Sequence, residues 1–444
     1  MTTQATKDDL DELCINSIRF LAVDAVQKAG NGHPGAPMGA AAMAYVLWDR
    51  FLKHNPADPT WPDRDRFVLS AGHASILLYS LLHLTGYDLP IDEIKRLRKW
   101  GSLTPGHPER GLTSGVEMTT GPLGQGFAHG VGMAIAQKWL ADHYNRPGHD
   151  IIDHHIYAFV SDGDMEEGVS SEAASLAATL KLGKLVYLYD DNDISIEGNT
   201  DIAFTEDVGA RFRAYGWHVV GPIDGMDTSA VEQAIREARD ETERPSLVVA
   251  QTTIGYGSPN KANTGAAHGE ALGEDEVALT RKSLGWAYEP FDVPAPALGH
   301  FREALVRGSR DQGDWEARLE AYTKAFPVEA AQLQADLSGE PPSGWARDFG
   351  ELFSTEEKPI ATRDASNRVM NEIAKHVHGF TGGSADLAPS NKTLLKEHGD
   401  FGFEAPVDHN MHFGVREHAM GAIAGGMALH GGVVPYTATF LIFS

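Results

Sequence analysis

The sequence predicts an α/β protein in which parallel sheets are flanked by helices. From about residue 151 onward, apolar runs of strand length alternate with helical patterns. Such alternation is typical of βαβ units, in which each helix returns the chain to the start of a parallel strand. The chain has 444 residues, 42% of them hydrophobic. That length is sufficient for roughly two to four domains.

The first predicted elements in chain order are two helical segments. Residues 10–28 repeat apolar side chains at helical spacing, and Gly30 is predicted to end that helix. The loop NGHPGAPMG leads into a second apolar segment at 40–51. From 61 to 130, short apolar runs alternate with turn clusters such as SLTPGHPERG. This part of the chain therefore carries several turns rich in glycine and proline.

Four strands are predicted between residues 151 and 254, with helices between them. The strands are the apolar runs at 151–160, 185–189, 217–221 and 245–254. The helices are the Ala-rich stretch 170–182, closed by Gly183, and the charged repeat at 230–241. A mainly parallel sheet follows from this order.

The sequence divides into a first domain, 1–312, a linker, 313–358, and a second domain, 359–444. The linker is charged and contains PP, GW and EEKP, so we expect short helices there. The second domain begins with a helical pattern at 362–377 and later carries a helix ending in glycines within 414–432. Its last segment, VVPYTATFLIFS, is predicted to be a strand. Because the sequence stops on that apolar run, we expect this α/β domain to be incomplete and an unpaired sheet edge to be exposed.

Composition narrows the classes of function. The formal net charge is −25, from 37 basic and 62 acidic residues, which argues against general binding of nucleic acid or anionic membrane. No window approaches the roughly 18 apolar residues of a membrane helix. The single cysteine, Cys14, excludes an internal disulfide framework and a Cys-based zinc site. With a polar, acidic N-terminus unlike a signal peptide, these features favour a cytoplasmic location.

Two acidic turns carry the strongest chemical signal. SDGDMEEG at 161–168 and DDNDI at 190–194 each follow a predicted buried strand directly. Ligands bind at the carboxyl ends of parallel strands, so both turns are expected to meet in one crevice. Asp162 offers a carboxylate, Asn192 an amide oxygen and Ile194 a backbone carbonyl, a set that suits Mg²⁺ or Ca²⁺ on a diphosphate. The alternative is two ordinary acidic turns.

Histidines in small-residue turns are the second signal. His33, His73, His107 and His268 each lie beside a glycine or in a Gly-rich turn, and some of them are expected to converge. Histidine donates hydrogen bonds to phosphate or sugar oxygens and moves protons near neutral pH. Solvated loop histidines are the alternative. His154 and His155 are predicted to be structural, and no close pair has the spacing of a zinc site.

Three further features are weaker. The loop GPLGQG at 121–126 permits close approach of a ligand, but it is neither a dinucleotide fingerprint nor a Walker loop. Glu417 stands at the predicted start of a helix, either as a charge partner of the helix N-terminus or as a buried acid. Arg363 and Ser390 form a plausible phosphate-binding pair.

Taken together, these motifs resemble those of transketolases, a family of thiamine diphosphate enzymes. SDGDMEEG through DDNDI looks like the family's cofactor signature. NGHPGAP, SAGHA, TPGHPE, GPLGQG, GGSADL and GVREHAMGAI also match in order, from about residue 8 to the last residue. The resemblance implies a thiamine diphosphate-binding fold, with 1–312 as the diphosphate-binding domain and 359–444 as part of the pyrimidine-binding domain. The resemblance further implies a third, C-terminal domain, which we do not expect within these 444 residues.

The resemblance also implies residue roles. Mg²⁺, or Ca²⁺, is expected on Asp162, Asn192 and the Ile194 carbonyl. Contacts to thiamine diphosphate are expected from His73, Gly121, Pro122, Leu123, Gly163, Glu167, Asn192, His268, Glu417, Phe440 and Phe443. Glu417 is expected to pair with the pyrimidine ring and thereby promote loss of the thiazolium C2 proton. The remaining catalytic groups are His33, His107 and His268, and the sugar phosphate is expected on those histidines, Arg363 and Ser390.

The implied activity is reversible transfer of a two-carbon ketol unit between sugar phosphates. The donor would be xylulose 5-phosphate and the acceptor ribose 5-phosphate or erythrose 4-phosphate, as in the pentose phosphate pathway. Family members are homodimers with the cofactor between the first domain of one subunit and the second domain of the other, so Glu417 would act in the neighbour's site. Two alternatives stay open: a dihydroxyacetone synthase, or a non-catalytic remnant that binds cofactor or dimerises. The TPGHPE histidine argues against 1-deoxyxylulose-5-phosphate synthase.

One position departs from the family signature. The first glycine of the GDG motif is Ser161 here. Serine is expected to be tolerated if its φ angle is negative.

Overall fold

The computed structural model describes residues 7–345, 347–354, 358–402 and 404–443. Its first part is built on a five-stranded parallel sheet in the order β1-β2-β3-β7-β6. The strands are β1 (Arg66–Leu69), β2 (Ile156–Ser161), β3 (Leu185–Asp191), β6 (His218–Asp224) and β7 (Ser246–Gln251). The predicted α/β class, with parallel strands and intervening helices, is confirmed.

Successive side chains of the central strands enter two different cores. Tyr157 and Phe159 lie in the core on one face of the sheet, and Ile156, Ala158 and Val160 lie in the core on the other. Side chains alternate along a strand, so a strand buried on both faces is apolar throughout. This explains why the predicted strands appear as continuous apolar runs.

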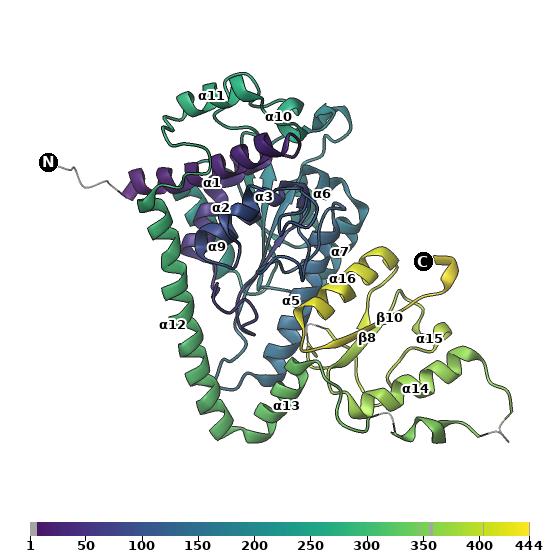
Figure 1. Cartoon of the computed structure of the whole chain (residues 1–444). Coiled ribbons are helices and arrows are strands. Elements are labelled where there is room, and N and C mark those ends of the chain that lie inside the picture. The colour runs from purple at the N-terminus through teal and green to yellow at the C-terminus, as the bar shows by residue number, and fades with distance from the viewer. Residues whose placement is uncertain (1–6, 346, 355–357, 403, 444) are drawn as a thin grey trace.

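Helices cover both faces of this sheet (Figure 1). Core residues on one face come from α1 (Lys7–Ala29), α2 (Gly35–Arg50), α3 (Ser75–Thr85), α9 (Thr228–Asp240) and α12 (Ala295–Ala325). Those on the other face come from α5 (Gln125–Tyr144), α7 (Gly168–Thr179), α8 (Val208–Tyr215), α13 (Pro327–Ser338) and α16 (Glu417–His430). Shorter elements are α4 (Ile91–Ile94), α6 (Asp162–Glu166), α10 (Gly265–Gly269), α11 (Glu274–Ser283) and the hairpin of β4 (Ile194–Ser195) and β5 (Gly198–Asn199).

The second part is a three-stranded parallel sheet in the order β10-β8-β9. Its elements are α14 (Thr362–His376), β8 (Phe380–Ser384), α15 (Ala388–Asn391), β9 (Asn410–His412), α16 and β10 (Val434–Ala438). The prediction of a strand to the end of the chain is wrong, because a 3₁₀ turn forms at Leu441–Phe443. The β8–β10 ladder ends at the pair Ser384–Ala438, where β8 itself ends.

The region between the two sheets is more regular than the sequence predicted. The predicted short helices are present as α13 and a 3₁₀ helix at Arg347–Leu352, but α12 runs for 31 residues and passes through the predicted boundary at 312/313. Pro327 then starts α13, and Gly339 ends it in the left-handed conformation. The short strand β1 and the long helix α5 were not predicted. No helix among the residues described is long and apolar enough to cross a membrane.

The second part docks on the first through two helices that approach closely, α5 and α16 (Figure 1). A Cβ atom placed on Gly132 of α5 would lie 1.9 Å from the Ile423 carbonyl oxygen of α16. A Cβ placed on Gly426 of α16 would lie 1.9 Å from the His129 carbonyl oxygen. The two glycines therefore set the distance between the helix backbones.

Gly132→Ala is expected to destabilise the folded chain by about 1–3 kcal/mol, because the methyl group forces the two backbones apart. Gly313→Ala is the matched control, since Gly313 is also helical but has open space around it. That change is expected to stabilise the chain by about 0.5–1 kcal/mol through helix propensity. Chemical denaturation measures both free energies of unfolding, and equal effects would contradict the account of the helix crossing.

Candidate active site

The two acidic turns meet at the carboxyl edge of the first sheet. Strands β2 and β3 are parallel neighbours, and Ser161 pairs with Asp190 at the end of the ladder. The turn that begins at Asp162 therefore lies beside the turn that contains Asn192. The predicted adjacency of the two turns is confirmed.

These turns open into a cavity of about 800 Å³. Most of the predicted site residues of the first part line it, namely His33, His73, His107, Gly121, Leu123, Asp162, Gly163, Glu167, Asn192, Ile194 and His268. Pro122 is not among the lining residues. The structure thus brings together side chains from turns that span the sequence from 33 to 268.

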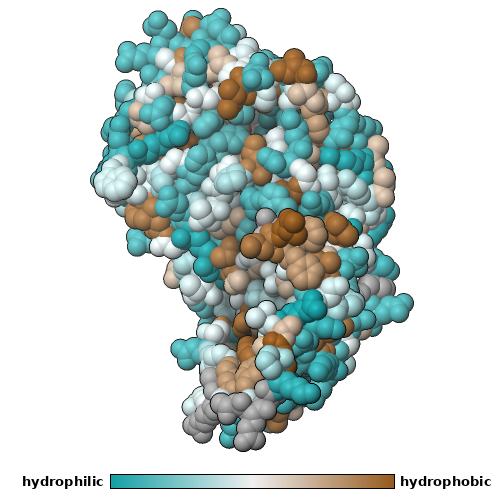
Figure 2. Space-filling view, turned by 90° about the vertical axis from the view of Figure 1, so that its right-hand side faces the viewer, coloured by the Kyte–Doolittle hydropathy of each residue, from teal (hydrophilic) through white to brown (hydrophobic). Residues whose placement is uncertain are grey.

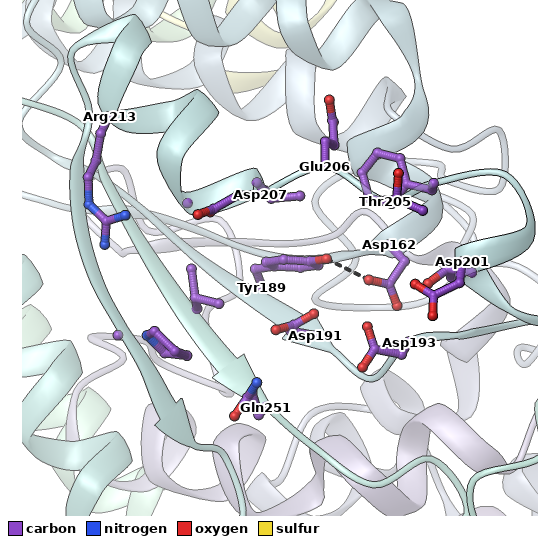
Figure 3. A pocket seen from close by; sticks show the side chains of 17 residues that line it. Asp162, Tyr189, Asp191, Asp193, Asp201, Thr205, Glu206, Asp207, Arg213 and Gln251 are labelled. Carbon is purple, nitrogen blue, oxygen red and sulfur yellow. Dashed lines mark hydrogen bonds between the residues drawn. The ribbon is translucent and has the colours of Figure 1, made fainter.

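A second, more acidic cavity of about 380 Å³ lies next to the first and shares Asp162 and Thr200 with it. Figure 3 shows Asp191, Asp193 and Asp201 around it, with the Tyr189 hydroxyl directed at Asp162. Asp162 thus borders both cavities, and these three other carboxylates lie on the side of the smaller cavity.

Asp162 is a buried acid whose surroundings disfavour its ionised form. Its side chain is buried at the start of α6, and its Oδ1 accepts a 2.5 Å hydrogen bond from the Tyr189 hydroxyl. Its Oδ2 is buried without a hydrogen-bond partner. Burial raises the pKa of Asp162 to about 7, and Asp190, Asp191 and Asp193 add to the rise against the lowering effect of Tyr189. A cation at Oδ2 would relieve both the missing partner and the charge repulsion.

Asn192 and Ile194 supply the other candidate oxygens. The Asn192 Nδ2 donates to Asp190 Oδ2 at 3.0 Å, which assigns Oδ1 to the opposite side of the amide. That Oδ1 accepts the Ile194 N–H at 3.1 Å, and the Ile194 carbonyl accepts a hydrogen bond from the His268 ring. Among the residues described, no group of three or more His, Cys, Asp or Glu side chains is arranged to hold a metal. A single carboxylate with two neutral oxygens fits Mg²⁺ or Ca²⁺ only if phosphate oxygens or water complete the shell.

Asp164 connects the turns around the cavity, a role that the sequence did not reveal. It is fully buried and accepts hydrogen bonds from Ser70 Oγ at 2.6 Å, the Gly124 N–H at 2.7 Å and the Ser161 N–H at 2.8 Å. Three separate loops are therefore held by one carboxylate. The second acid of the SDGD motif is the one sequence signal that could have pointed to it.

Ser161 fits its position without strain. Its φ angle is −118°, and it forms a capping box with Asp164 at the start of α6. Serine is therefore tolerated here for the predicted reason.

Three of the four predicted histidines pack against each other. The rings of His73 and His268 are stacked with centroids 5.0 Å apart, and the His33 ring lies 5.2 Å from His73 and 5.8 Å from His268. Burial, with smaller contributions from His268, Arg98 and His107, lowers the pKa of His33 to about 4. His33 Nδ1 and His268 Nδ1 are buried without partners. These neutral rings offer unpaired nitrogen atoms to a polar ligand.

The glycines of the site are places of close approach. A Cβ on Gly163 would lie 2.7 Å from the Leu123 side chain, and one on Gly121 would lie 3.3 Å from the His107 ring. Gly121 also has a φ angle of +152°. Side chains at these positions would fill the space between the loops, so glycine keeps the cavity open.

Glu417 and the C-terminal aromatics lie elsewhere. Glu417 is the first residue of α16, as predicted, and it lines a separate cavity of about 540 Å³ with Phe443, Gln125 and His129. Phe440 is half-buried and Phe443 is exposed. Arg363, in the first turn of α14, and Ser390, in α15, are exposed and line none of the cavities described here. One chain therefore does not bring the second-part residues to the histidine cavity.

His154 and His155 are buried next to β2 and outside the cavity. His154 contacts Asp63 at 3.0 Å and His430 of α16 at 2.8 Å. His154 therefore supports packing between the two parts, and His155 packs beside Tyr157 within the first part, in line with the predicted structural role.

His73 is expected to make the folded chain less stable in acid. Burial, followed by His268, His33 and His107, lowers its pKa from 6.5 to about 3. The folded state binds fewer protons than the unfolded state between these values, so this stability is fully present above pH 6.5 and is lost as the pH falls toward 3.

His73→Gln should reduce the pH dependence of the free energy of unfolding by up to about 1.4 kcal/mol per pH unit in this range. Chemical denaturation of the cofactor-free chain at about pH 7.5 and about pH 5.5 measures the difference. His412→Gln is a control, because that ring is 57% exposed. An unchanged slope in the His73 variant would contradict the expectation.

Comparisons with known proteins agree with this geometry. The family model described as transketolase, thiamine diphosphate binding domain, matches residues 10–342, and the one described as transketolase, pyrimidine binding domain, matches 358–444. Curated relatives include a transketolase of Nostoc sp., 54% identical over 438 residues, and transketolase 1 of Escherichia coli, 54% identical over 431 residues. They cover 98% and 96% of this chain.

Solved structures show the same fold. A transketolase of Pichia stipitis in complex with sedoheptulose 7-phosphate has a TM-score of 0.94 at 44% identity, over 98% of this chain. A transketolase of Leishmania mexicana has a TM-score of 0.95 at 44% identity, over 99% of this chain. The chain spans about 65% of the length of these relatives and structures. With two family models that together match most of its residues, this chain belongs to the transketolase family.

Proposed function

We propose that this chain takes part in transketolase chemistry, the reversible transfer of a two-carbon ketol unit from xylulose 5-phosphate to ribose 5-phosphate or erythrose 4-phosphate. The observation that carries the proposal is the cavity that Asp162, Asn192 and Ile194 line together with a cluster of neutral histidines. This arrangement suits a diphosphate on a divalent cation with a polyhydroxylated substrate beside it. A complex of a Pichia stipitis relative with sedoheptulose 7-phosphate supports the substrate class.

Thiamine diphosphate is the proposed cofactor, with Mg²⁺, or Ca²⁺, on Asp162 Oδ2, Asn192 Oδ1 and the Ile194 carbonyl. Asp162 Oδ2 is a buried carboxylate oxygen without a hydrogen-bond partner, and a bound cation would supply the missing partner. Gly121, Leu123, Gly163 and Glu167 line the same cavity and would contact the cofactor. When bound, the cofactor supplies the carbanion chemistry that amino-acid side chains cannot provide.

The protein's own groups would orient the reactants and move protons. His33 and His268 each carry a buried, unpartnered Nδ1, and these atoms are proposed to bind or shuttle protons at the sugar hydroxyls. His107 lines the same cavity and would bind the sugar as well. The lowered pKa values of His33 and His73 keep their rings neutral, so the unprotonated nitrogens remain available as acceptors near neutral pH.

A homodimer with a shared site is the proposed assembly. In one chain, Glu417 and Phe443 line a different cavity from Asp162 and the histidines, so a site that uses both sets needs a second copy. Figure 2 views the side on which the C-terminus lies in Figure 1, and it shows hydrophobic side chains gathered near the middle of that face. Val415 is 76% exposed, Leu441 90% and Ile442 84%. A partner subunit would cover such residues.

Mixing two inactive variants tests the shared site. Chain Asp162→Ala lacks the cation ligand, and chain Glu417→Ala lacks the carboxylate of α16. In a shared-site dimer, each mixed dimer has one intact site, so random pairing restores about a quarter of all sites. Exchange of the cofactor C2 proton, measured by NMR, reports intact sites. No recovery after mixing and re-equilibration would contradict a site built from two copies.

A coupled assay of ketol transfer from xylulose 5-phosphate to ribose 5-phosphate tests the activity. Turnover by this chain would support transketolase chemistry, and preference for formaldehyde as acceptor would indicate a dihydroxyacetone synthase. Intact binding of thiamine diphosphate without turnover would instead support the non-catalytic remnant.

A cytoplasmic location is proposed as well, supported by a single, buried cysteine and an acidic composition.

A further inference from the structure

The end of β3 contacts both side chains that are proposed to hold the cation. Tyr189 is 3% exposed, and its hydroxyl donates to Asp162 Oδ1 at 2.5 Å. Asp190, the next residue, accepts the Asn192 Nδ2 on its Oδ2 at 3.0 Å. Two consecutive residues of one strand therefore touch two ligand side chains from two turns.

Each contact leaves a particular oxygen available. Asp162 has two carboxylate oxygens, and because Tyr189 occupies Oδ1, the buried and unpartnered Oδ2 is the one left for a cation. Asn192 has one oxygen and one NH₂ group, and a rotated amide would present N–H donors to the cation instead. Donation from Nδ2 to Asp190 excludes that rotation and keeps Oδ1 as the acceptor.

Both orienting residues are themselves held in place. The ladder between β2 and β3 pairs Val160 with Tyr189 and Ser161 with Asp190. The Thr252 hydroxyl, just beyond β7, donates to Asp190 Oδ1, so both oxygens of that carboxylate are occupied. The sheet therefore fixes the positions from which the ligand oxygens are directed.

We propose that Tyr189 and Asp190 are positioning residues that direct Asp162 Oδ2 and Asn192 Oδ1 toward the divalent cation. The inference rests on the proposed cofactor site and adds how that site gains its geometry. Groups that hydrogen-bond to metal ligands typically contribute a factor of about 10–100 in metal affinity. Mg²⁺ requires near-ideal octahedral geometry, whereas Ca²⁺ accepts flexible coordination, so preset oxygens favour Mg²⁺.

Tyr189→Phe removes only the hydroxyl group and is the first test. Titration of MgCl₂ into the chain saturated with thiamine diphosphate, followed by calorimetry, is expected to show Mg²⁺ affinity lowered by about 10–100-fold. Affinity for Ca²⁺ should fall less, so the ratio of the two affinities changes. A merely structural tyrosine would not alter that ratio.

Tyr187→Phe is the matched control. Tyr187 lies two residues earlier on β3, is fully buried, and donates to the Phe127 carbonyl at 2.5 Å, away from the cation ligands. It should lower the unfolding temperature and leave both metal affinities unchanged. Equal Mg²⁺ affinity in Tyr189→Phe and the unsubstituted chain, or an equal loss in Tyr187→Phe, would overturn the inference for Tyr189.

A rescue experiment tests Asp190. Asp190→Ala frees the Asn192 amide and should weaken Mg²⁺ binding in the same calorimetric titration. Adding Asn192→Asp should restore much of the loss, because a carboxylate presents an oxygen in either orientation. Unchanged affinity in Asp190→Ala, or no recovery in the double variant, would overturn the role of Asp190. If the unsubstituted chain showed no Mg²⁺-dependent binding, the proposed cofactor site itself would fail, which is a different result.

Discussion

Asp162→Ala is expected to abolish the Mg²⁺-dependent binding of thiamine diphosphate. The variant removes the one carboxylate of the candidate ligand set and the oxygen that is buried without a partner. We expect the affinity for the cofactor in the presence of Mg²⁺ to fall by more than about 100-fold, beyond the usual effect of losing a supporting residue. Isothermal titration calorimetry with and without Mg²⁺ measures the change.

The stability of the cofactor-free variant separates binding from folding. Burial and three neighbouring aspartates raise the pKa of Asp162 to about 7, so the ionised carboxylate is disfavoured in the folded chain. Asp162→Ala should therefore be at least as stable as the parent above pH 7 when no cofactor is present. Asp201→Ala, an exposed acid of the neighbouring cavity, is the control for a lost charge. Retained Mg²⁺-dependent binding in Asp162→Ala would contradict the metal assignment.

Glu417→Ala is expected to leave the diphosphate contacts largely intact and to stop the loss of the cofactor C2 proton. The reason is spatial, because Glu417 lines the cavity at the start of α16 and lies apart from Asp162, Asn192 and the histidines. Replacing Glu417 should therefore slow the loss of the C2 proton far more than it weakens binding of the diphosphate. NMR measurement of hydrogen–deuterium exchange at C2, together with calorimetry, separates the two effects.

Glu417→Gln provides the conservative comparison, since it keeps the shape and removes the charge. Both variants should bind thiamine diphosphate within a few-fold of the parent, and exchange at C2 should fall by at least about 100-fold, the scale of a lost general acid or base. Normal exchange in Glu417→Ala would refute the role of this carboxylate.

The sequence predicted that the two acidic turns of the candidate site meet, because these motifs coincide with strand ends. Asp162 and Asn192 each follow an apolar run, and parallel strands place their carboxyl ends on one edge, so adjacency followed from topology. Tyr189 and Asp164 were missed for the opposite reason. One is an apolar-looking strand residue and the other an ordinary acid of a turn, and only their contacts across the sheet reveal what they hold.

Elements buried on all sides were also hard to predict. Helix α5 lies between the sheet and α16. Apolar residues and glycines therefore occur on most sides of the helix, and it lacks the continuous polar face that marks a surface helix. Strand β1 has only four residues, too few for a recognisable alternation. The distance of Glu417 from the histidine cavity could not be predicted from spacing, since it depends on how α16 packs on α5.

The most direct test of the account is to locate the cation. Crystals grown with thiamine diphosphate and Mn²⁺ in place of Mg²⁺ should give an anomalous scattering peak between Asp162 Oδ2, Asn192 Oδ1 and the Ile194 carbonyl, next to the two phosphates. A peak in the acidic cavity beyond Asp162, or ordered diphosphate at the histidines with no peak beside Asn192, would contradict the claim that the two turns hold the cofactor through a shared ion.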